Sequence, residues 1–296
     1  MFCKILHIAK KCGNILQKQS ARKQIKVKIY GKEVGTYFAV YKSITYYNYS
    51  MSQQADRRKF MDNNKALNEF TAQYYGQLAA GVYNEPMSIN AKETALIIID
   101  AQKCITKEYF VEGYRAMGID VEPLMPVLNQ LEENTNIALN NIEKILIKCR
   151  EKGIRPIHVR IQSLLPDSKD TGRLHSSAGM YYPPNGFASE FCEQVKPIEG
   201  EIVLNKTCSG ICVGTPIDRI LRNLHIKGVI VTGFYTDQCV STSIRDLADL
   251  GYEVDMIEDA MMAMSKERHE RALQGIKFIY ANCESTAKLL ARMELL

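Results

Sequence analysis

The segment 228-GVIVTGFYTDQCV-240 gives the clearest indication of how this chain folds. It opens with an aliphatic run over 228–234 and closes on Cys239, which directly precedes a segment with helical periodicity over 241–250. A short aliphatic run followed at once by a helical pattern is typical of a strand buried on both faces of a parallel sheet. Cys239 is therefore predicted where a strand passes into a helix. There it is either a packed thiol or a nucleophile.

The same alternation of strand and helix patterns continues from Thr94 to the end of the chain. Aliphatic runs of strand length predict strands over 95–100, 154–161, 201–206, 228–234, 252–258 and 279–283. Amphipathic segments predict helices over 123–152, 215–224, 239–250, 266–279 and from Ser285 onward. Strands that alternate with helices predict a doubly wound α/β fold, with a mostly parallel sheet flanked by helices. Residues 162–200, rich in Ser, Pro, Gly and Asp, are expected to form a long excursion over the active face.

The charge of the chain is unevenly distributed. The net charge is +5, yet residues 1–50 carry ten Lys or Arg against one acid, Glu33, which leaves −4 for the remainder. The main body therefore gives no electrostatic reason to expect nucleic acid as a partner. No apolar run reaches the roughly 18 residues of a membrane span, so none is expected.

Composition also suggests how the chain is divided. Residues 1–50 are interpreted as a basic N-terminal extension, either flexible or targeting, and 51–90 as a helical lead-in with an amphipathic helix over 55–76. Residues 91–296 then form the main domain. Nine cysteines without a CxxC pair or a secretory signal favour a reducing compartment, hence a cytoplasmic location, or a mitochondrion-related organelle if 1–50 is a targeting segment. Cys208 and Cys212, lacking further ligands nearby, are interpreted as structural thiols and not as a zinc site.

Three ionisable residues stand at the carboxyl ends of predicted strands. Asp100 follows the first strand, Lys206 ends the third, and Cys239 follows the fourth. Ligands of open parallel sheets bind beyond that edge, so these side chains are predicted to share one small hollow that solvent reaches.

Each of the three residue types has a chemical task in such company. A thiolate attacks carbonyl carbon. The pKa of a cysteine thiol is ordinarily about 8.5, and that of Cys239 is expected to fall beside the Lys206 ammonium or at a helix N-terminus. Asp100 is placed to accept the thiol proton and return it to a leaving amine, while backbone N–H groups of the turn stabilise an oxyanion. Taken singly, Asp100 also suits a helix cap, Lys206 a solvated position and Cys239 a core position. Their coincidence at one edge favours the catalytic interpretation.

Three sequence blocks resemble the isochorismatase-like cysteine hydrolase family: 95-ALIIIDAQ-102, 203-VLNKTCSGICVGTPIDRILRNLHIKGVIVTGFYTDQCV-240 and 241-STSIRDLADLGYEVDMIEDA-260. The resemblance covers roughly residues 90–290. It implies a Rossmann-like three-layer fold and a triad of Asp100, Lys206 and Cys239. It also implies a cis peptide between Phe234 and Tyr235, an oxyanion hole formed by the N–H groups of Tyr235 and Cys239, and a homo-oligomer.

Two departures from the family narrow the predicted chemistry. Ether-cleaving isochorismatases commonly have Gly in place of the nucleophile, whereas this chain has Cys239. Nicotinamidases carry a metal site after the second strand, but the corresponding stretch here, 158-HVRIQSLLPDSKD-170, has His158 alone, and the next histidine is His175. No metal and no other cofactor are therefore expected, and His158 is interpreted as a packed or hydrogen-bonded strand residue.

The sequence thus predicts a hydrolase that cleaves the C–N bond of a small amide or ureido compound. The tail pattern 268-RHERALQGIKFIYANCEST-286 and the blocks above most resemble the amidohydrolase branch that acts on biuret, N-carbamoylsarcosine or ureidoacrylate. Three alternatives stay open: an isochorismatase-type ether hydrolase, a catalytically idle relative that serves binding or oligomerisation, and a basic N-terminal segment that binds an anionic surface or nucleic acid. The substrate is expected to be chosen by residues 162–200, and 208-CSGIC-212 departs from the usual pattern after the lysine.

Overall fold

The computed structural model describes residues 67, 69–70, 73–74 and 86–296. The chain divides into two units, 1–68 and 69–296, of which the second holds the sheet. The predicted N-terminal extension and most of the predicted 55–76 helix lie outside the described residues. The positions of that helix which are described, 67, 69–70 and 73–74, are helical.

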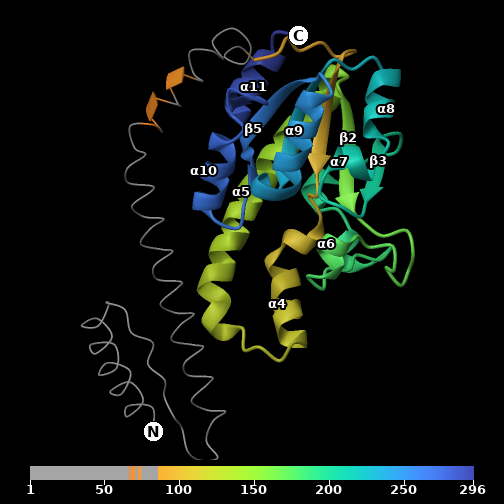
Figure 1. Ribbon diagram of the computed structural model, residues 1–296, viewed down its shortest axis with the longest axis vertical. Helices are drawn as coiled ribbons and strands as arrows, with labels where there is room; N and C mark the ends of the chain where they lie inside the picture. The colour runs from red at the N-terminus through yellow and green to blue at the C-terminus, as the bar shows by residue number, and fades with distance from the viewer. Residues whose placement is uncertain (1–66, 68, 71–72, 75–85) are drawn as a thin grey trace, which may run out of the picture. The chain divides into compact units, whose positions relative to one another are not determined.

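Six parallel strands form a single sheet in the order β3-β2-β1-β4-β5-β6 (Figure 1). The strands are β1 (Thr94–Ile99), β2 (Arg155–Ile161), β3 (Ile202–Lys206), β4 (Gly228–Phe234), β5 (Glu253–Met262) and β6 (Asn282–Glu284). The chain builds outward from β1 to β3 on one side, then returns to β4 and builds outward on the other. The predicted doubly wound α/β fold is confirmed, and the reversal of direction lies between β1 and β4.

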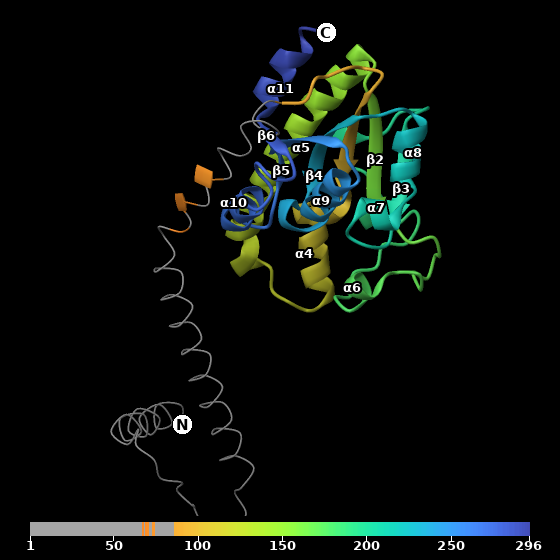
Figure 2. The ribbon, with the colours of Figure 1, turned by 45° about the horizontal axis from the view of Figure 1, so that its top comes forward.

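Helices cover both faces of this sheet (Figures 1 and 2). The α-helices are α4 (Lys107–Ala116), α5 (Met125–Lys152), α6 (Arg173–Ser176), α7 (Ile211–Gly214), α8 (Ile217–Asn223), α9 (Ser241–Asp249), α10 (Lys266–Gln274) and α11 (Thr286–Met293). Among the described residues, none of these helices combines the length and apolar character that crossing a membrane requires.

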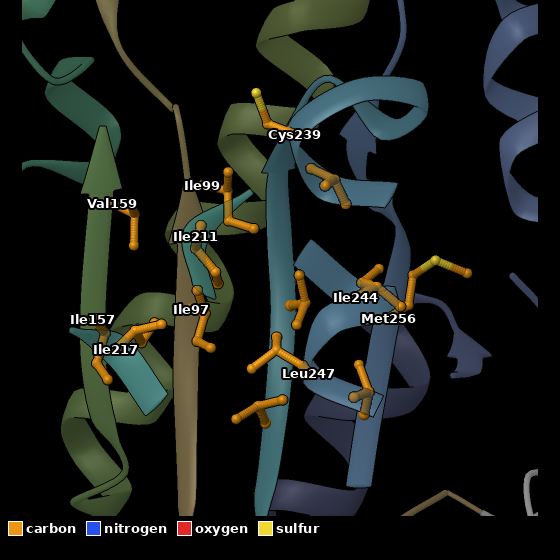
Figure 3. Close-up of a cluster of buried hydrophobic side chains, with 14 of the residues drawn as sticks. Ile97, Ile99, Ile157, Val159, Ile211, Ile217, Cys239, Ile244, Leu247 and Met256 are labelled. Carbon is orange, nitrogen blue, oxygen red and sulfur yellow. The ribbon is translucent and has the colours of Figure 1, made fainter. Parts of the chain in front are cut away.

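The two central strands explain why the sheet is covered twice. Every residue of β1 and of β4 is buried. Along β1, Ile97 and Ile99 pack into a core with α7, α8 and α9 (Figure 3), while Leu96 and Ile98 pack into a second core with α5 and α11. Successive strand residues point to opposite faces, so a continuous aliphatic run supplies both cores at once.

The ends of β1 and β4 are pressed tightly together. Gly233 has φ of 121°, and a Cβ at this position would lie 2.0 Å from the Ile99 carbonyl oxygen. Only glycine combines this backbone conformation with so close an approach. The segments that leave these two strands therefore begin side by side, at the point where the sheet reverses direction.

The structure differs from the predicted elements mainly near the C-terminus. The sequence predicts that this strand ends at Glu258, but β5 continues to Met262. The two carboxylates that interrupt its apolar pattern both have hydrogen-bond partners. Glu258 accepts from Lys277, and Asp259 accepts from the Thr286 N–H and hydroxyl. The predicted 266–279 helix ends at Gln274, before Gly275. The last strand lies later than predicted, at Asn282–Glu284. Earlier in the chain, the helix α4 was not predicted at all.

Candidate active site

Asp100 lies immediately beyond β1 in a left-handed backbone conformation, with φ of 51°. Asp and Asn adopt this region more readily than other non-glycine residues. The Asp100 N–H donates to the Val159 carbonyl of β2 over 2.8 Å, which fixes the turn against the neighbouring strand. The side chain of Asp100 is thereby held at the carboxyl edge of the sheet, and only 3% of the residue is exposed.

Cys239 lies beyond β4 in the turn Thr236–Val240, which leads into α9 (Figure 3). The Phe234–Tyr235 peptide bond before this turn is cis. Inside the turn, Gln238 has non-helical dihedrals, φ −126° and ψ −107°. Cys239 is 5% exposed, so the thiol predicted to be reachable from solvent is nearly closed off.

Lys206 reaches this site from a distance. It ends β3, which is separated from β1 by β2, and strands two apart in a sheet are about 10 Å from each other. The extended side chain crosses that gap and uses the three donors of its ammonium group. Its Nζ lies 2.8 Å from Asp100 Oδ2, 3.1 Å from the Cys208 carbonyl and 3.5 Å from Cys239 Sγ. A shorter cation could not span this distance.

The structure therefore brings Asp100, Lys206 and Cys239 into one buried cluster, with Lys206 in contact with both of the others. Within the described part of the chain, Asp100 Oδ1 is buried and has no hydrogen-bond partner. One carboxylate oxygen is thus committed to the ammonium group while the other remains available as an acceptor. Buried polar atoms without a partner are rare and commonly mark a position that meets a ligand or a transferred proton.

Electrostatics in the cluster differ from the sequence expectation for the thiol. Burial and, after it, the Asp100 carboxylate raise the pKa of the Cys239 thiol to about 12, and the Lys206 ammonium opposes them without prevailing. The predicted fall of the Cys239 pKa is therefore wrong, because desolvation and a nearby negative charge outweigh one cation. For Lys206, burial alone would lower the pKa, but the attraction of Asp100 raises it, so the ammonium group stays charged. The resting cluster holds a neutral thiol beside an ion pair.

Alkylation by iodoacetamide should report this protonation state. Because the Cys239 pKa is about 12, the thiolate fraction and the labelling rate should both rise about tenfold for each pH unit between roughly pH 7 and pH 9. Mass spectrometry of the labelled peptides would follow Cys239 against the half-buried Cys208, with Cys239→Ser as control. A Cys239 rate that levels off below about pH 8 would show instead a depressed pKa.

Further residues that the sequence analysis did not single out surround the cluster. Gln102 is fully buried; its amide donates to the Ile161 and Ala188 carbonyls, and its oxygen accepts from the Ile161 N–H. Tyr109 of α4 and Tyr182 of the 162–200 segment interact through their hydroxyls, and the Asp100 charge contributes to raising the Tyr182 pKa, after burial and the effects of Cys104 and Tyr109. The sequence position of Gln102, two residues beyond Asp100 at the end of a predicted strand, could have indicated that it lies near the site. Nothing in the sequence indicated this for Tyr109, because α4 was not predicted.

The 162–200 segment packs against this edge of the sheet. The Gly172 N–H donates to the carbonyl of Thr207, the residue after Lys206, and the buried His175 has its Nδ1 3.3 Å from the same oxygen. Ser163 accepts from Ser168 or donates to it, and its N–H donates to the Tyr182 carbonyl. The predicted excursion over the active face thus contacts the loop that follows the site lysine.

His158 is fully buried in β2, and its Nε2 lies 2.9 Å from Glu201 Oε2. The interpretation of His158 as a hydrogen-bonded strand residue is confirmed. Burial lowers its pKa, so the ring is neutral near neutral pH, although Glu201 acts in the opposite direction. Across the described ranges, no three His, Cys, Asp or Glu side chains gather as a set of metal ligands.

Comparison with known proteins shows to which family the chain belongs. The isochorismatase domain matches residues 94–288, which is most of the described chain. A ureidoacrylate amidohydrolase, RutB, of Klebsiella pneumoniae is 28% identical over 186 residues, covering 60% of this chain and 76% of that protein. An uncharacterized isochorismatase family protein, YrdC, of Bacillus subtilis is 34% identical over 146 residues, covering 49% of this chain and 71% of its own length.

Solved structures agree on the fold. A cysteine hydrolase from Pseudomonas syringae pv. phaseolicola superimposes with a TM-score of 0.59 at 24% identity, covering 72% of this chain and 97% of that one. The domain match spans about two thirds of the chain and assigns its family. The chain belongs to the isochorismatase family of hydrolases.

Proposed function

We propose that this protein hydrolyses the C–N bond of a small amide or ureido compound through a covalent intermediate on Cys239. The contact of Asp100 with Lys206, and of Lys206 with Cys239, carries the proposal. The free oxygen Asp100 Oδ1 supplies the acceptor that a neutral thiol needs. The relative named as a ureidoacrylate amidohydrolase supports an amide or ureide as the substrate class.

In the first half-reaction the thiol proton passes from Cys239 to Asp100 as the sulfur attacks the carbonyl carbon. Because the resting thiol has a pKa of about 12, the transfer accompanies the attack and does not precede it. The N–H groups of Tyr235 and Cys239 are proposed to stabilise the oxyanion. The C–N bond then breaks, Asp100 returns the proton to nitrogen, and ammonia or an amine leaves a thioester on Cys239.

In the second half-reaction water gives a proton to Asp100 and its oxygen attacks the thioester. The carbon–sulfur bond breaks, the acid leaves, and the proton held by Asp100 restores the Cys239 thiol. Lys206 keeps its charge throughout and stabilises the sulfur as negative charge develops on it. Every proton in the proposed cycle thus moves between Cys239, Asp100, the leaving nitrogen and water. The proposed reaction is therefore independent of a metal.

Ammonia release from a panel of small amides and ureides tests this function. Biuret, N-carbamoyl amino acids and ureidoacrylate would be compared in the wild type and in Cys239→Ala, with isochorismate as the ether substrate. Release from at least one C–N substrate, lost in Cys239→Ala, is the expected result. Cleavage of the ether alone, or equal release by the two proteins, would contradict the proposal.

The proposal also includes the cellular compartment and the oligomeric state of the enzyme. The seven described cysteines are all free, which suits the reducing, cytosolic compartment proposed for the enzyme. A homo-oligomer is also proposed, and sedimentation velocity of the full chain would test it directly.

A further inference from the structure

The turn that carries Cys239 needs support from outside itself. Its backbone is irregular at Gln238, and the Gln238 and Val240 N–H groups both donate to one acceptor, the Tyr235 carbonyl, over 2.9 and 3.3 Å. Sγ of Cys239 lies 3.5 Å from Lys206 Nζ, an ordinary distance for a hydrogen bond to sulfur. Asp100 and Lys206 lie on other elements, so a displacement of this turn would change the position of the thiol relative to both.

The first turn of α10 contacts this segment through two consecutive residues. His269 Nδ1 lies 2.8 Å from Thr236 Oγ1, and Arg268 Nε donates to Asp237 Oδ2 over 2.6 Å. Ser265 caps α10 and accepts from the Arg268 N–H, which fixes the start of the helix. Adjacent residues of a capped helix thus hold adjacent residues of the turn.

The two contacts differ in burial. Thr236 is fully buried, whereas the Arg268 side chain is 56% exposed and its ion pair is screened by solvent. A buried hydroxyl that loses its partner costs far more than an exposed ion pair. Of the two contacts from α10, the one between Thr236 and His269 therefore contributes more to holding the turn, beside the hydrogen bond of 2.6 Å that Ser243 donates to the Cys239 carbonyl.

We propose that His269 is a positioning residue, which sets the place of Cys239 Sγ beside Asp100 and Lys206 by holding Thr236. This inference rests on the proposed function, since it assigns His269 a part in the same reaction. His269 does not touch the reacting atoms: it acts through Thr236, three residues before the nucleophile. Misplacing a reacting group by about 1 Å costs about 10²-fold in rate.

The surroundings of His269 suit this role. It is half-buried and lines an open pocket of about 490 Å³ together with Glu258, Glu270 and Lys277. Burial lowers the pKa of His269, and the charge of Lys277 lowers it further. The carboxylates of Glu258, Glu270 and Asp237 act in the opposite direction without prevailing, so the imidazole is neutral near neutral pH. The Nδ1 of a neutral ring pairs with the Thr236 hydroxyl in either tautomer, as the acceptor or as the donor.

Substitution of His269 tests the inference with the full-length chain and a substrate from the ammonia panel. His269→Ala should lower kcat about 10- to 100-fold with KM within about threefold, because the substrate contacts remain. His269→Asn, whose amide offers a donor and an acceptor, should restore most of the kcat. Thr236→Val should match His269→Ala, and the double variant should be no worse than either. Arg271→Ala, an exposed residue of α10, serves as the control.

A second readout separates this inference from the proposed function. If no panel compound is hydrolysed, iodoacetamide labelling of Cys239 decides: a rate that differs at least about threefold from the wild type in His269→Ala, and returns to the wild-type value in His269→Asn, supports the positioning role. Wild-type labelling in His269→Ala overturns it. If substrates are hydrolysed, a kcat in folded His269→Ala within about twofold of wild type, or a failure of His269→Asn to restore it, also overturns the role.

Discussion

Asp100→Asn is expected to lower kcat about 10²- to 10⁴-fold while leaving the protein folded. The carboxamide keeps the shape of the side chain, and Asn accepts the left-handed backbone that Asp100 adopts. The variant loses the capacity to take the thiol proton at Oδ1, and also the charge that pairs with the buried Lys206 ammonium, which lowers its stability as well. Since the Cys239 pKa is about 12, no other route to the thiolate operates efficiently near neutral pH. Ammonia release under saturating substrate would measure the loss.

The control for this variant is Glu267→Gln, at an exposed carboxylate of α10 that pairs with Arg271. Its activity should equal that of the wild type. A folded Asp100→Asn protein with kcat within tenfold of wild type would remove Asp100 from the role of proton acceptor, whatever its contact with Lys206.

Lys206→Met is expected to lower the free energy of unfolding by about 3–5 kcal/mol. Asp100 is 3% exposed and would be left as a buried carboxylate without its cation. Methionine retains much of the apolar length of the lysine stem, so the cost reflects the lost charge more than lost packing. Urea unfolding of the wild type and the variant would give the difference.

A double variant identifies the cause of this loss. Asp100→Asn combined with Lys206→Met removes both charges and should recover a large part of the stability lost in Lys206→Met alone. Lys169→Met, at a residue whose side chain is 80% exposed, should be neutral. A Lys206→Met protein within about 1 kcal/mol of wild type would show that the pair does not behave as buried charges.

The sheet was predictable because its central strands leave little choice. β1 and β4 are aliphatic along their whole length and buried on both faces, so their pattern excludes a half-exposed element. The errors fall where tertiary contacts satisfy polar residues, as for Glu258 and Asp259 within β5. α4, which buries no residue fully, was missed although its apolar periodicity is as marked as that of α10.

The positions of the site residues were predictable, but not its electrostatics. A topological rule places the ends of parallel strands at one edge, and Asp100, Lys206 and Cys239 do meet there. The direction of the Cys239 pKa shift depends on burial, which the local sequence does not report. Tyr182 and His269 lie far from the cluster in sequence, and only the folded chain shows their contacts.

The most direct test of the account is mass spectrometry of the enzyme quenched with acid during its first turnover. With a substrate from the ammonia panel, the peptide that contains Cys239 should gain the mass of the acyl group, and hydroxylamine should remove it as expected for a thioester. Turnover with the acyl group on another residue, or with no adduct on any cysteine, would contradict the covalent role of Cys239.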